Sequence, residues 1–239
     1  MKEFFIADGW YWFLIAAAAC YIIGCFNFAV LISLIKKKDI RGEGSGNPGT
    51  MNMTRTFGLK VGAVNFFCDV VKGGAPAIAA YFIFKGYVFA GTEVFVSDFA
   101  RYFFGLFVII GHIFPVTMKF KGGKGIASTM GLFAFALPCE KIWFLPVALA
   151  LLICVLLYIV ITEWGSMGSL LGVASLTVWQ AALFAVRYSN CLKNAWVVAT
   201  FMILLALNFL TWFAHRKNIF KLLAGEEHRT SVRKRKKVK

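Results

Sequence analysis

Long apolar runs restrict the fold of this chain more than any other feature. A helix that crosses a bilayer needs about 20 mostly apolar residues, and only helices and closed barrels satisfy their backbone groups there. Five runs reach that length and two are shorter. We therefore expect an all-α integral membrane protein with about seven transmembrane helices in one membrane-embedded domain, residues 1–224. The predicted spans are residues 10–35, 59–84, 99–116, 126–137, 142–161, 166–186 and 195–214.

The first and fourth runs differ from ordinary spans. The N-terminal run continues past Cys20 to Ile35, which is too long for the apolar part of a signal peptide, and acidic Glu3 and Asp8 precede it. We expect a first helix that is retained. The fourth run is short, so it should tilt, start inside the protein beside the preceding loop, or be partly re-entrant.

Basic residues are distributed unevenly between the two sides of this topology. Segments 36–60, 117–124, 162–165 and 215–239 hold 19 Lys and Arg residues, whereas the connections on the other side hold six. The positive-inside rule places the N-terminus outside and the C-terminus in the cytoplasm. The formal charge is +15, but the Lys and Arg residues form no amphipathic stripe with exposed aromatic residues, which argues against a nucleic-acid partner. The basic tail, residues 225–239, is expected to lie near anionic headgroups.

The first polar segment, GSGNPGTMNMTR, occupies residues 44–55 between the first two spans. Its glycines, including Gly49, make the backbone flexible enough for N–H groups to converge on an anion. Arg55 adds a planar, permanently charged group that suits phosphate. The segment predicts a phosphate site, although an ordinary Gly-Asn-Pro turn would use the same residues.

The second polar segment joins GHIFP at residues 111–115 to FKGGKG at residues 120–125, where the fourth span begins. A Gly-Gly-Lys-Gly sequence that opens a helix gathers free N–H groups, the positive end of the helix dipole and a lysine. We therefore predict that phosphate binds at Gly122, Gly123, Lys124 and Gly125. The Walker spacing is absent, so nucleotide hydrolysis is not implied. His112 suits either a helix-end hydrogen bond or catalysis.

Two pairs of polar residues share helix faces through a spacing of three. His215 and Asn218 follow the last span, where helix dipole and topology also explain cationic residues. Asp69 and Lys72 lie inside the second span, where ionisable groups usually face the protein interior in pairs. We expect Asp69 and Lys72 to form a buried supporting pair near the site.

Small residues and cysteines favour packing roles. Ser166 and Ser169 open the sixth span together with several glycines, and close helix packing explains them as well as function does. The six cysteines show no CxxC pair and lie mostly in apolar runs. No cluster of carboxylates or of Cys and His has metal-ligand spacing, so no metal or cofactor is expected.

In order along the chain, these segments resemble the polytopic bacterial glycerol-3-phosphate acyltransferases that use acyl phosphate as donor. The resemblance covers most of the chain through DIR (39–41), GSGNPGTMNMTR, DVVKG (69–73), GHIFPVTMKFKGGKGIAS and HRKNIFKLLAGEE. Thr50-Met51 stands where the family often has Ala-Thr, and the basic tail extends beyond the family's usual end. The HxxxxD pattern of other acyltransferases is absent, because the fifth residue after His112 is Thr117.

The resemblance implies transfer of a fatty acyl group from acyl phosphate to the sn-1 hydroxyl of glycerol 3-phosphate. The products are lysophosphatidic acid and phosphate, early in phospholipid synthesis, and the site faces the cytoplasm from a bacterial plasma membrane. Catalytic positions by motif are Arg55, His112, Lys124, His215 and Asn218. Substrate-binding positions by motif are Ser45, Gly46, Asn47, Asn52, Arg55, Gly122, Gly123, Lys124, Ser169, Asn218 and Glu226.

Acyl phosphate is already activated, so direct attack by the hydroxyl is the simplest chemistry. Arg55, Lys124 and backbone N–H groups would stabilise the developing negative charge. The proton acceptor is His112, His215 or the donor's own phosphate. The alternative function is a transporter of a phosphorylated anion, which usually places its site at the membrane midplane between repeated halves. Here the motifs cluster at one face, and no repeat is visible; the oligomeric state stays open.

Overall fold

A computed structural model describes residues 1–226 of the chain, and helices dominate this part. The last thirteen residues of the predicted basic tail, 227–239, lie outside the described part. The elements are β1 (Lys2–Phe4), α1 (Ile6–Cys25), α2 (Phe28–Ile35), η1 (Ile40–Gly42), α3 (Thr50–Phe57), α4 (Leu59–Phe84), β2 (Tyr87–Phe89), α5 (Val96–Ile113), η2 (Val116–Met118), α6 (Ile126–Glu140), α7 (Phe144–Thr162), α8 (Gly165–Arg187), η3 (Ser189–Cys191), α9 (Ala195–Ala214) and α10 (Arg216–Leu223).

Within residues 1–226, six helical segments are long and apolar enough to cross a membrane. They are Ile6–Ile35, Leu59–Phe84, Val96–Met118, Phe144–Thr162, Gly165–Arg187 and Ala195–Ala214, while α6 is a shorter apolar helix. Together they account for the seven predicted runs. Helices α4 and α9 begin and end at the predicted residues, and the ends of α5 to α8 lie within three residues of prediction.

The first predicted span is two helices, which corrects the expectation of a single helix over residues 10–35. Helix α1 ends at Cys25 and α2 begins at Phe28. Asn27 caps α2, because its Oδ1 accepts the N–H of Val30 at 3.0 Å, and its Nδ2 donates to the Pro48 carbonyl at 3.2 Å. The Lys72 ammonium donates to the Phe26 carbonyl at 2.8 Å. These polar contacts stabilise a break between α1 and α2 that the hydropathy of the sequence does not predict.

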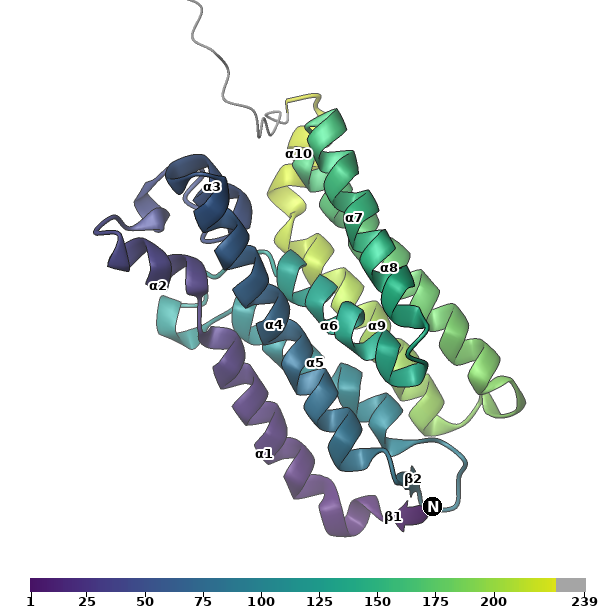
Figure 1. The fold of residues 1–239 in the computed structure, drawn as a ribbon. Coiled ribbons are helices and arrows are strands. Elements are labelled where there is room, and N and C mark those ends of the chain that lie inside the picture. Colours follow the sequence, from purple (N-terminus) through teal and green to yellow (C-terminus); the bar gives the residue numbers. More distant parts are fainter. Residues whose placement is uncertain (227–239) are drawn as a thin grey trace, which may run out of the picture.

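The long helices alternate in direction, so their connections gather at two ends of the bundle (Figure 1). The segments 36–58, 114–125, 163–164 and 215–226 lie toward the end that carries α3 and α10, which we call the α3/α10 end. The opposite end holds the N-terminus and a short parallel pairing of β1 with β2, which the sequence did not predict. Each polar segment singled out in the sequence therefore lies toward the α3/α10 end.

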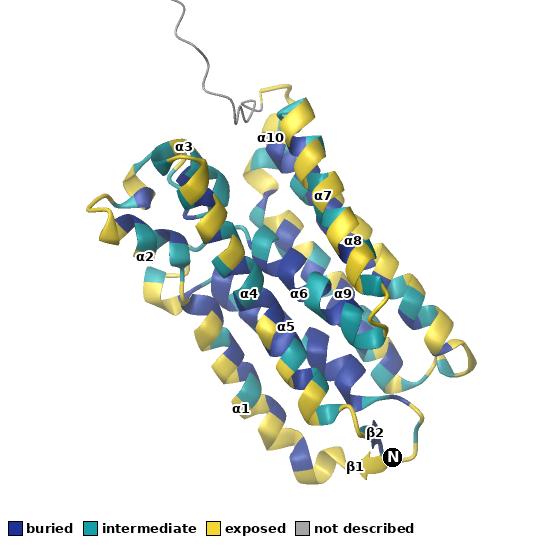
Figure 2. Cartoon of the chain, viewed as in Figure 1, coloured by how far each residue is buried: buried dark blue, intermediate teal, exposed yellow. Residues whose placement is uncertain are grey.

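Burial separates the bundle interior from an apolar outer surface (Figure 2). Large apolar side chains remain exposed on the outer helices, for example Ile161 at 77%, Val186 at 76% and Phe209 at 67%. In a water-soluble chain such a surface would be unfavourable, whereas lipid tails solvate it. The exposed apolar surface is the membrane-facing surface of the protein.

Helices α4 and α6 pack closely through glycine. A β-carbon on Gly73 of α4 would collide with the Ser128 carbonyl, and one on Gly131 of α6 would collide with the Val70 carbonyl. Small residues allow helix backbones to approach in this way where lipid provides no hydrophobic driving force. The contact places the first turn of α6 beside the middle of α4.

Candidate active site

Three segments that are distant in the sequence meet around Lys124. The Lys124 Nζ donates to Asn218 Oδ1 at 2.8 Å, across 94 residues. The Asn218 Nδ2 donates in turn to Ser166 Oγ at 2.7 Å. Lys124 precedes α6, Asn218 lies on α10 and Ser166 lies on α8, so one network joins the starts of two helices to the chain after the last span.

His215 lies beside this network at the end of α9. Its Nδ1 is 2.8 Å from the Thr211 carbonyl, which can only accept, so Nδ1 carries the proton and Nε2 of the neutral ring keeps its lone pair. Burial, followed by the charge of Lys124, lowers the pKa of His215 to about 4. At neutral pH His215 is therefore an uncharged group that can accept a proton.

The Gly-Gly-Lys-Gly loop differs in detail from the predicted phosphate site. The N–H groups of Gly122 and Gly123 donate to the carbonyls of Ile113 and His112, each at 3.1 Å, so these two groups are not free for an anion. Both glycines are needed for close approach, since β-carbons would collide with the His112 carbonyl and Nε2. The anion-binding capacity of the loop therefore rests on Lys124 and the first turn of α6.

Helix α6 is too short to span a bilayer alone, and its start is recessed. Fifteen residues give a helix of about 22 Å, against a hydrocarbon core of about 30 Å. Its last residue, Glu140, contacts Arg101 and Arg187 toward the opposite end of the bundle. The start of α6 consequently lies deeper in the bundle than α3 and α10 (Figure 1). Of the outcomes predicted for this run, the structure shows a helix that starts inside the protein beside its preceding loop.

In the first polar segment, Asn52 organises the loop around Ser45. Its Oδ1 accepts the Ser45 N–H at 3.1 Å, and its Nδ2 donates to the Glu43 and Ile40 carbonyls at 2.8 and 3.3 Å. Asn52 is buried and both ends of its amide bind the chain's own backbone, so it shapes the loop. Gly46 has a φ of 69°, a conformation that favours glycine.

The other predicted residues of this segment lie on the loop surface. Ser45 is exposed, Gly46, Asn47 and Gly49 are half-buried, and Arg55 is exposed on α3. Gly49 precedes α3, and its carbonyl accepts the N–H of Met53 at 3.0 Å. The loop therefore presents Ser45 and the short helix that carries Arg55 at the α3/α10 end.

Asp69 and Lys72 of α4 form the buried ion pair that their spacing predicts. Their side chains are 4% and 2% exposed, and Lys72 Nζ lies 3.2 Å from Asp69 Oδ1. The same Nζ lies 2.8 Å from Nδ1 of His112 on α5. The pair therefore contacts the loop through His112, whose ring packs against Gly123.

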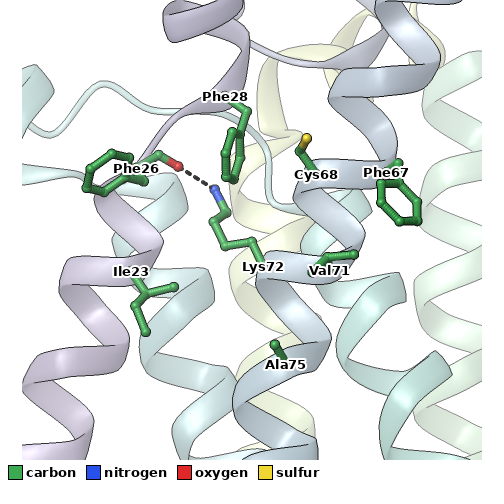
Figure 3. A pocket seen from close by; sticks show the side chains of 8 residues that line it. All are labelled: Ile23, Phe26, Phe28, Phe67, Cys68, Val71, Lys72 and Ala75. Carbon is green, nitrogen blue, oxygen red and sulfur yellow. Dashed lines mark hydrogen bonds between the residues drawn. The ribbon is translucent and has the colours of Figure 1, made fainter.

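An apolar cavity of about 400 Å³ lies beside Lys72, between α4 and the break that separates α1 from α2 (Figure 3). Its walls are Ile23, Phe26, Phe28, Phe67, Cys68, Val71, Lys72 and Ala75. Phe67 is 67% exposed and Phe26 is 62% exposed, so the cavity borders the membrane-facing surface. Lys72 is the charged residue in this otherwise apolar wall.

Known proteins are similar to this chain in sequence and in fold. The family model for glycerol-3-phosphate acyltransferase matches residues 14–225. The chain is 36% identical over 215 residues to the glycerol-3-phosphate acyltransferase of Finegoldia magna, covering 90% of this chain and 94% of that relative. The chain belongs to the glycerol-3-phosphate acyltransferase family. The enzyme class expected from the sequence is confirmed, and the transporter alternative loses its support.

Two solved structures show the same architecture as this acyltransferase. Both are described as PlsY (YgiH), an integral membrane glycerol 3-phosphate acyltransferase, in a glycerol 3-phosphate form and a lysophosphatidic acid form. The first superposes with a TM-score of 0.71 at 30% identity and the second with 0.69 at 29%. Each comparison covers 91% of this chain and 94% of the other. The acyltransferase is therefore a multi-pass integral membrane enzyme.

Two predicted positions of the acyltransferase lie outside the Lys124 network. Ser169 Oγ donates to the Gly165 carbonyl of its own helix at 2.7 Å, and Ser166, one turn earlier, contacts Asn218 instead. Glu226 is exposed where the described chain ends, and its N–H donates to the Lys221 carbonyl at 2.8 Å. Both serines share a helix face, so spacing alone does not distinguish them.

A second buried group of charges, not anticipated from the sequence, lies at the end opposite α3 and α10. Arg101 is fully buried, with Nη2 2.5 Å from Asp98 Oδ1 and 3.5 Å from Glu140. Arg187 contacts the same two carboxylates, at 2.7 Å for Asp98 and 3.8 Å for Glu140. Two cations and two anions balance one another and join α5, α6 and α8, so we assign the group a structural role.

Proposed function

We propose that this acyltransferase takes its acyl group from acyl phosphate and transfers it to the sn-1 hydroxyl of glycerol 3-phosphate. The observation that carries the proposal is the network from Lys124 through Asn218 to Ser166 at the recessed start of α6. Such a site concentrates positive charge where a phosphate group would bind. The related structures, in a glycerol 3-phosphate form and a lysophosphatidic acid form, support glycerol 3-phosphate as the acceptor and lysophosphatidic acid as the product.

The reaction needs charge neutralisation and alignment more than a covalent intermediate. The sn-1 oxygen bonds to the acyl carbonyl carbon, the bond from that carbon to the phosphate oxygen breaks, and phosphate leaves with the bonding electron pair. Lys124 and the first turn of α6 would stabilise one phosphate, and Arg55 would bind the other anionic group. Asn218, which accepts from Lys124, would hold the ammonium in position.

The hydroxyl proton has two candidate acceptors in this geometry. His215 Nε2 has a lone pair, because Nδ1 donates to the Thr211 carbonyl. The leaving phosphate is the other candidate. His112 is a poor candidate, because an ammonium can only donate, and its contact with Lys72 therefore occupies the Nδ1 lone pair.

The apolar cavity beside Lys72 supports an acyl donor with a long tail. Aromatic and aliphatic side chains dominate its wall, and it borders the membrane-facing surface, so a tail could enter sideways from lipid. Lys72 connects this wall to His112 and thereby to the loop before Lys124. We propose that the tail occupies this cavity while the phosphate lies at the start of α6.

The direct test measures ester formation from labelled glycerol 3-phosphate by purified protein in lipid, with acyl phosphate and acyl-CoA offered separately. We expect turnover with acyl phosphate. Lys124→Ala should lower kcat by about 10²- to 10³-fold, because a donor to the developing charge is removed. Lys121→Ala, an exposed lysine of the same loop, is the control and should leave the rate unchanged. Turnover with acyl-CoA alone, or near-normal activity of Lys124→Ala, would contradict the proposal.

A further inference from the structure

Helix α4 carries three polar side chains on one face inside the membrane: Asn65, Asp69 and Lys72. Their spacing of four and three residues aligns them along the helix, and they are 0%, 3% and 5% exposed. Ionisable groups inside a span are costly and usually serve a function. We call these three residues the α4 column.

One end of the α4 column holds the loop of the first polar segment. Asn65 Nδ2 donates to Thr50 Oγ1 and to Asp69 Oδ2, each at 3.2 Å. Thr50 is the first residue of α3, directly after the glycine-rich loop and five residues before Arg55. The start of α3 is therefore fixed to α4 by a partly buried hydrogen bond.

The other end of the α4 column holds the Gly-Gly-Lys-Gly loop through His112. The Lys72 Nζ bonds to His112 Nδ1 at 2.8 Å, and this assigns the ring proton of His112 to Nε2. Nε2 lies against Gly123, and the Gly123 N–H donates to the His112 carbonyl at 3.1 Å. Lys124 follows directly, so its backbone position depends on the His112 ring.

The contacts of Lys72 leave it no capacity to bind substrate. An ammonium has three N–H donors. The Nζ donates to the Phe26 carbonyl (2.8 Å), to His112 Nδ1 (2.8 Å) and to the Gly24 carbonyl (3.5 Å), and it forms an ion pair with Asp69 Oδ1 at 3.2 Å. The charge of Lys72 is balanced by Asp69, so the column adds no net charge that would attract an anion.

From these contacts we infer that the α4 column, acting with His112, sets the distance between two loops. One is the first glycine-rich loop, which leads into α3 and Arg55, and the other is the Gly-Gly-Lys-Gly loop that carries Lys124. The members of the column are positioning residues. Both loops are rich in glycine, and one rigid helix that anchors both would hold their separation fixed. A displacement of about 1 Å between reacting groups can cost about 10²-fold in rate. The inference rests on the proposed roles of Arg55 and Lys124 and adds the element that aligns them.

The test uses three variants. The first is a double variant, Asp69→Leu with Lys72→Met, which we call the apolar pair; the second is Asn65→Leu; and the third is the triple variant that combines all three substitutions. Replacing a buried ion pair by apolar residues of similar volume is often neutral for stability. We therefore expect the apolar pair to fold, with kcat per folded molecule about 10- to 100-fold lower and both KM values within about threefold. Asn65→Leu should lose a similar factor, and the triple variant no more than the larger single loss.

Val64→Leu, an exposed position on the same helix, is the matched control and should keep wild-type kinetics. Full activity of the apolar pair per folded molecule would overturn the inference. A raised KM with unchanged kcat would also overturn it, because that result assigns Lys72 to substrate binding. If the apolar pair does not fold, Asn65→Leu, which removes no charge, decides the question. All rates use whichever donor supports wild-type turnover, so a wrong donor does not affect the result.

Discussion

The two histidines of the site differ in the ring nitrogen that remains to take a proton. In His112 the Nδ1 lone pair faces the Lys72 ammonium, whereas in His215 the Nδ1 proton faces a carbonyl. Only His215 therefore offers a lone pair on Nε2 of a neutral ring. Sequence spacing treats the two residues alike, because tautomers depend on partners that are distant in the chain.

The pH dependence of the rate can distinguish the two proton acceptors. Burial and the Lys124 charge lower the pKa of His215 to about 4, so a His215 base predicts an acid limb of kcat/KM near pH 4. A phosphate base predicts a limb near about pH 6, the second pKa of a phosphate ester. His215→Ala should remove the first limb with a loss of about 10²- to 10⁴-fold in kcat/KM. A limb near pH 6 that persists in His215→Ala would assign the base to phosphate.

The lowered pKa of His215 also makes the stability of the folded protein depend on pH. Below pH 6.5 the unfolded chain protonates this imidazole while the folded protein keeps it neutral. The unfolded state then binds more protons, so stability rises with pH in this window. The stability that the protein gains from holding His215 neutral is fully present above about pH 6.5 and is lost as the pH falls toward 4.

Several residue roles required the structure. The motifs located Lys124, His215 and Asn218, yet the choice of Ser166 over Ser169 depends on the placement of α10, which no local pattern encodes. Asn52 resembles a ligand in sequence, but its amide binds backbone of its own loop. Asn65 was missed because a lone amide in an apolar span gives no signal without its partners.

Among the elements, the buried charges at the end opposite α3 and α10 should matter for stability. Arg101→Met would leave Asp98 and Glu140 without their most buried cation, and breaking such a group costs about 3–5 kcal/mol. We expect a lower Tm in detergent and unchanged activity per folded molecule. Lys193→Met, an exposed charge toward the same end, should shift Tm little. An unaltered Tm in Arg101→Met would refute the structural role.

Most helices could be predicted because length and hydrophobicity define a membrane span locally. The exceptions share one physical cause, which is tertiary contact. The break after α1 depends on Pro48 and Lys72, which bind Asn27 and the Phe26 carbonyl from distant segments. The short pairing of β1 with β2 joins residues that are far apart in the sequence.

For the whole molecule, the orientation in the membrane remains a prediction from the distribution of basic residues. Segments with 19 Lys and Arg residues should face the cytoplasm, against six on the other side, which places the active site on the cytoplasmic face. A fluorescent protein fused to the C-terminus should fluoresce in cells, and a periplasm-dependent phosphatase at the same position should be inactive. The opposite pair of results would invert the topology and place the site outside.

The shortness of α6 has a consequence for the traffic of substrates and product. A helix of about 22 Å leaves its start below the bilayer surface, so water must reach down to it while hydrocarbon surrounds the cavity beside Lys72. Under the proposed reaction, the water-soluble acceptor reaches the site from the aqueous phase, and the hydrophobic donor enters laterally from the bilayer. The product would then form with its headgroup near the lipid headgroups and its tail already among lipid tails. It could leave by diffusing sideways, without any extraction step through water.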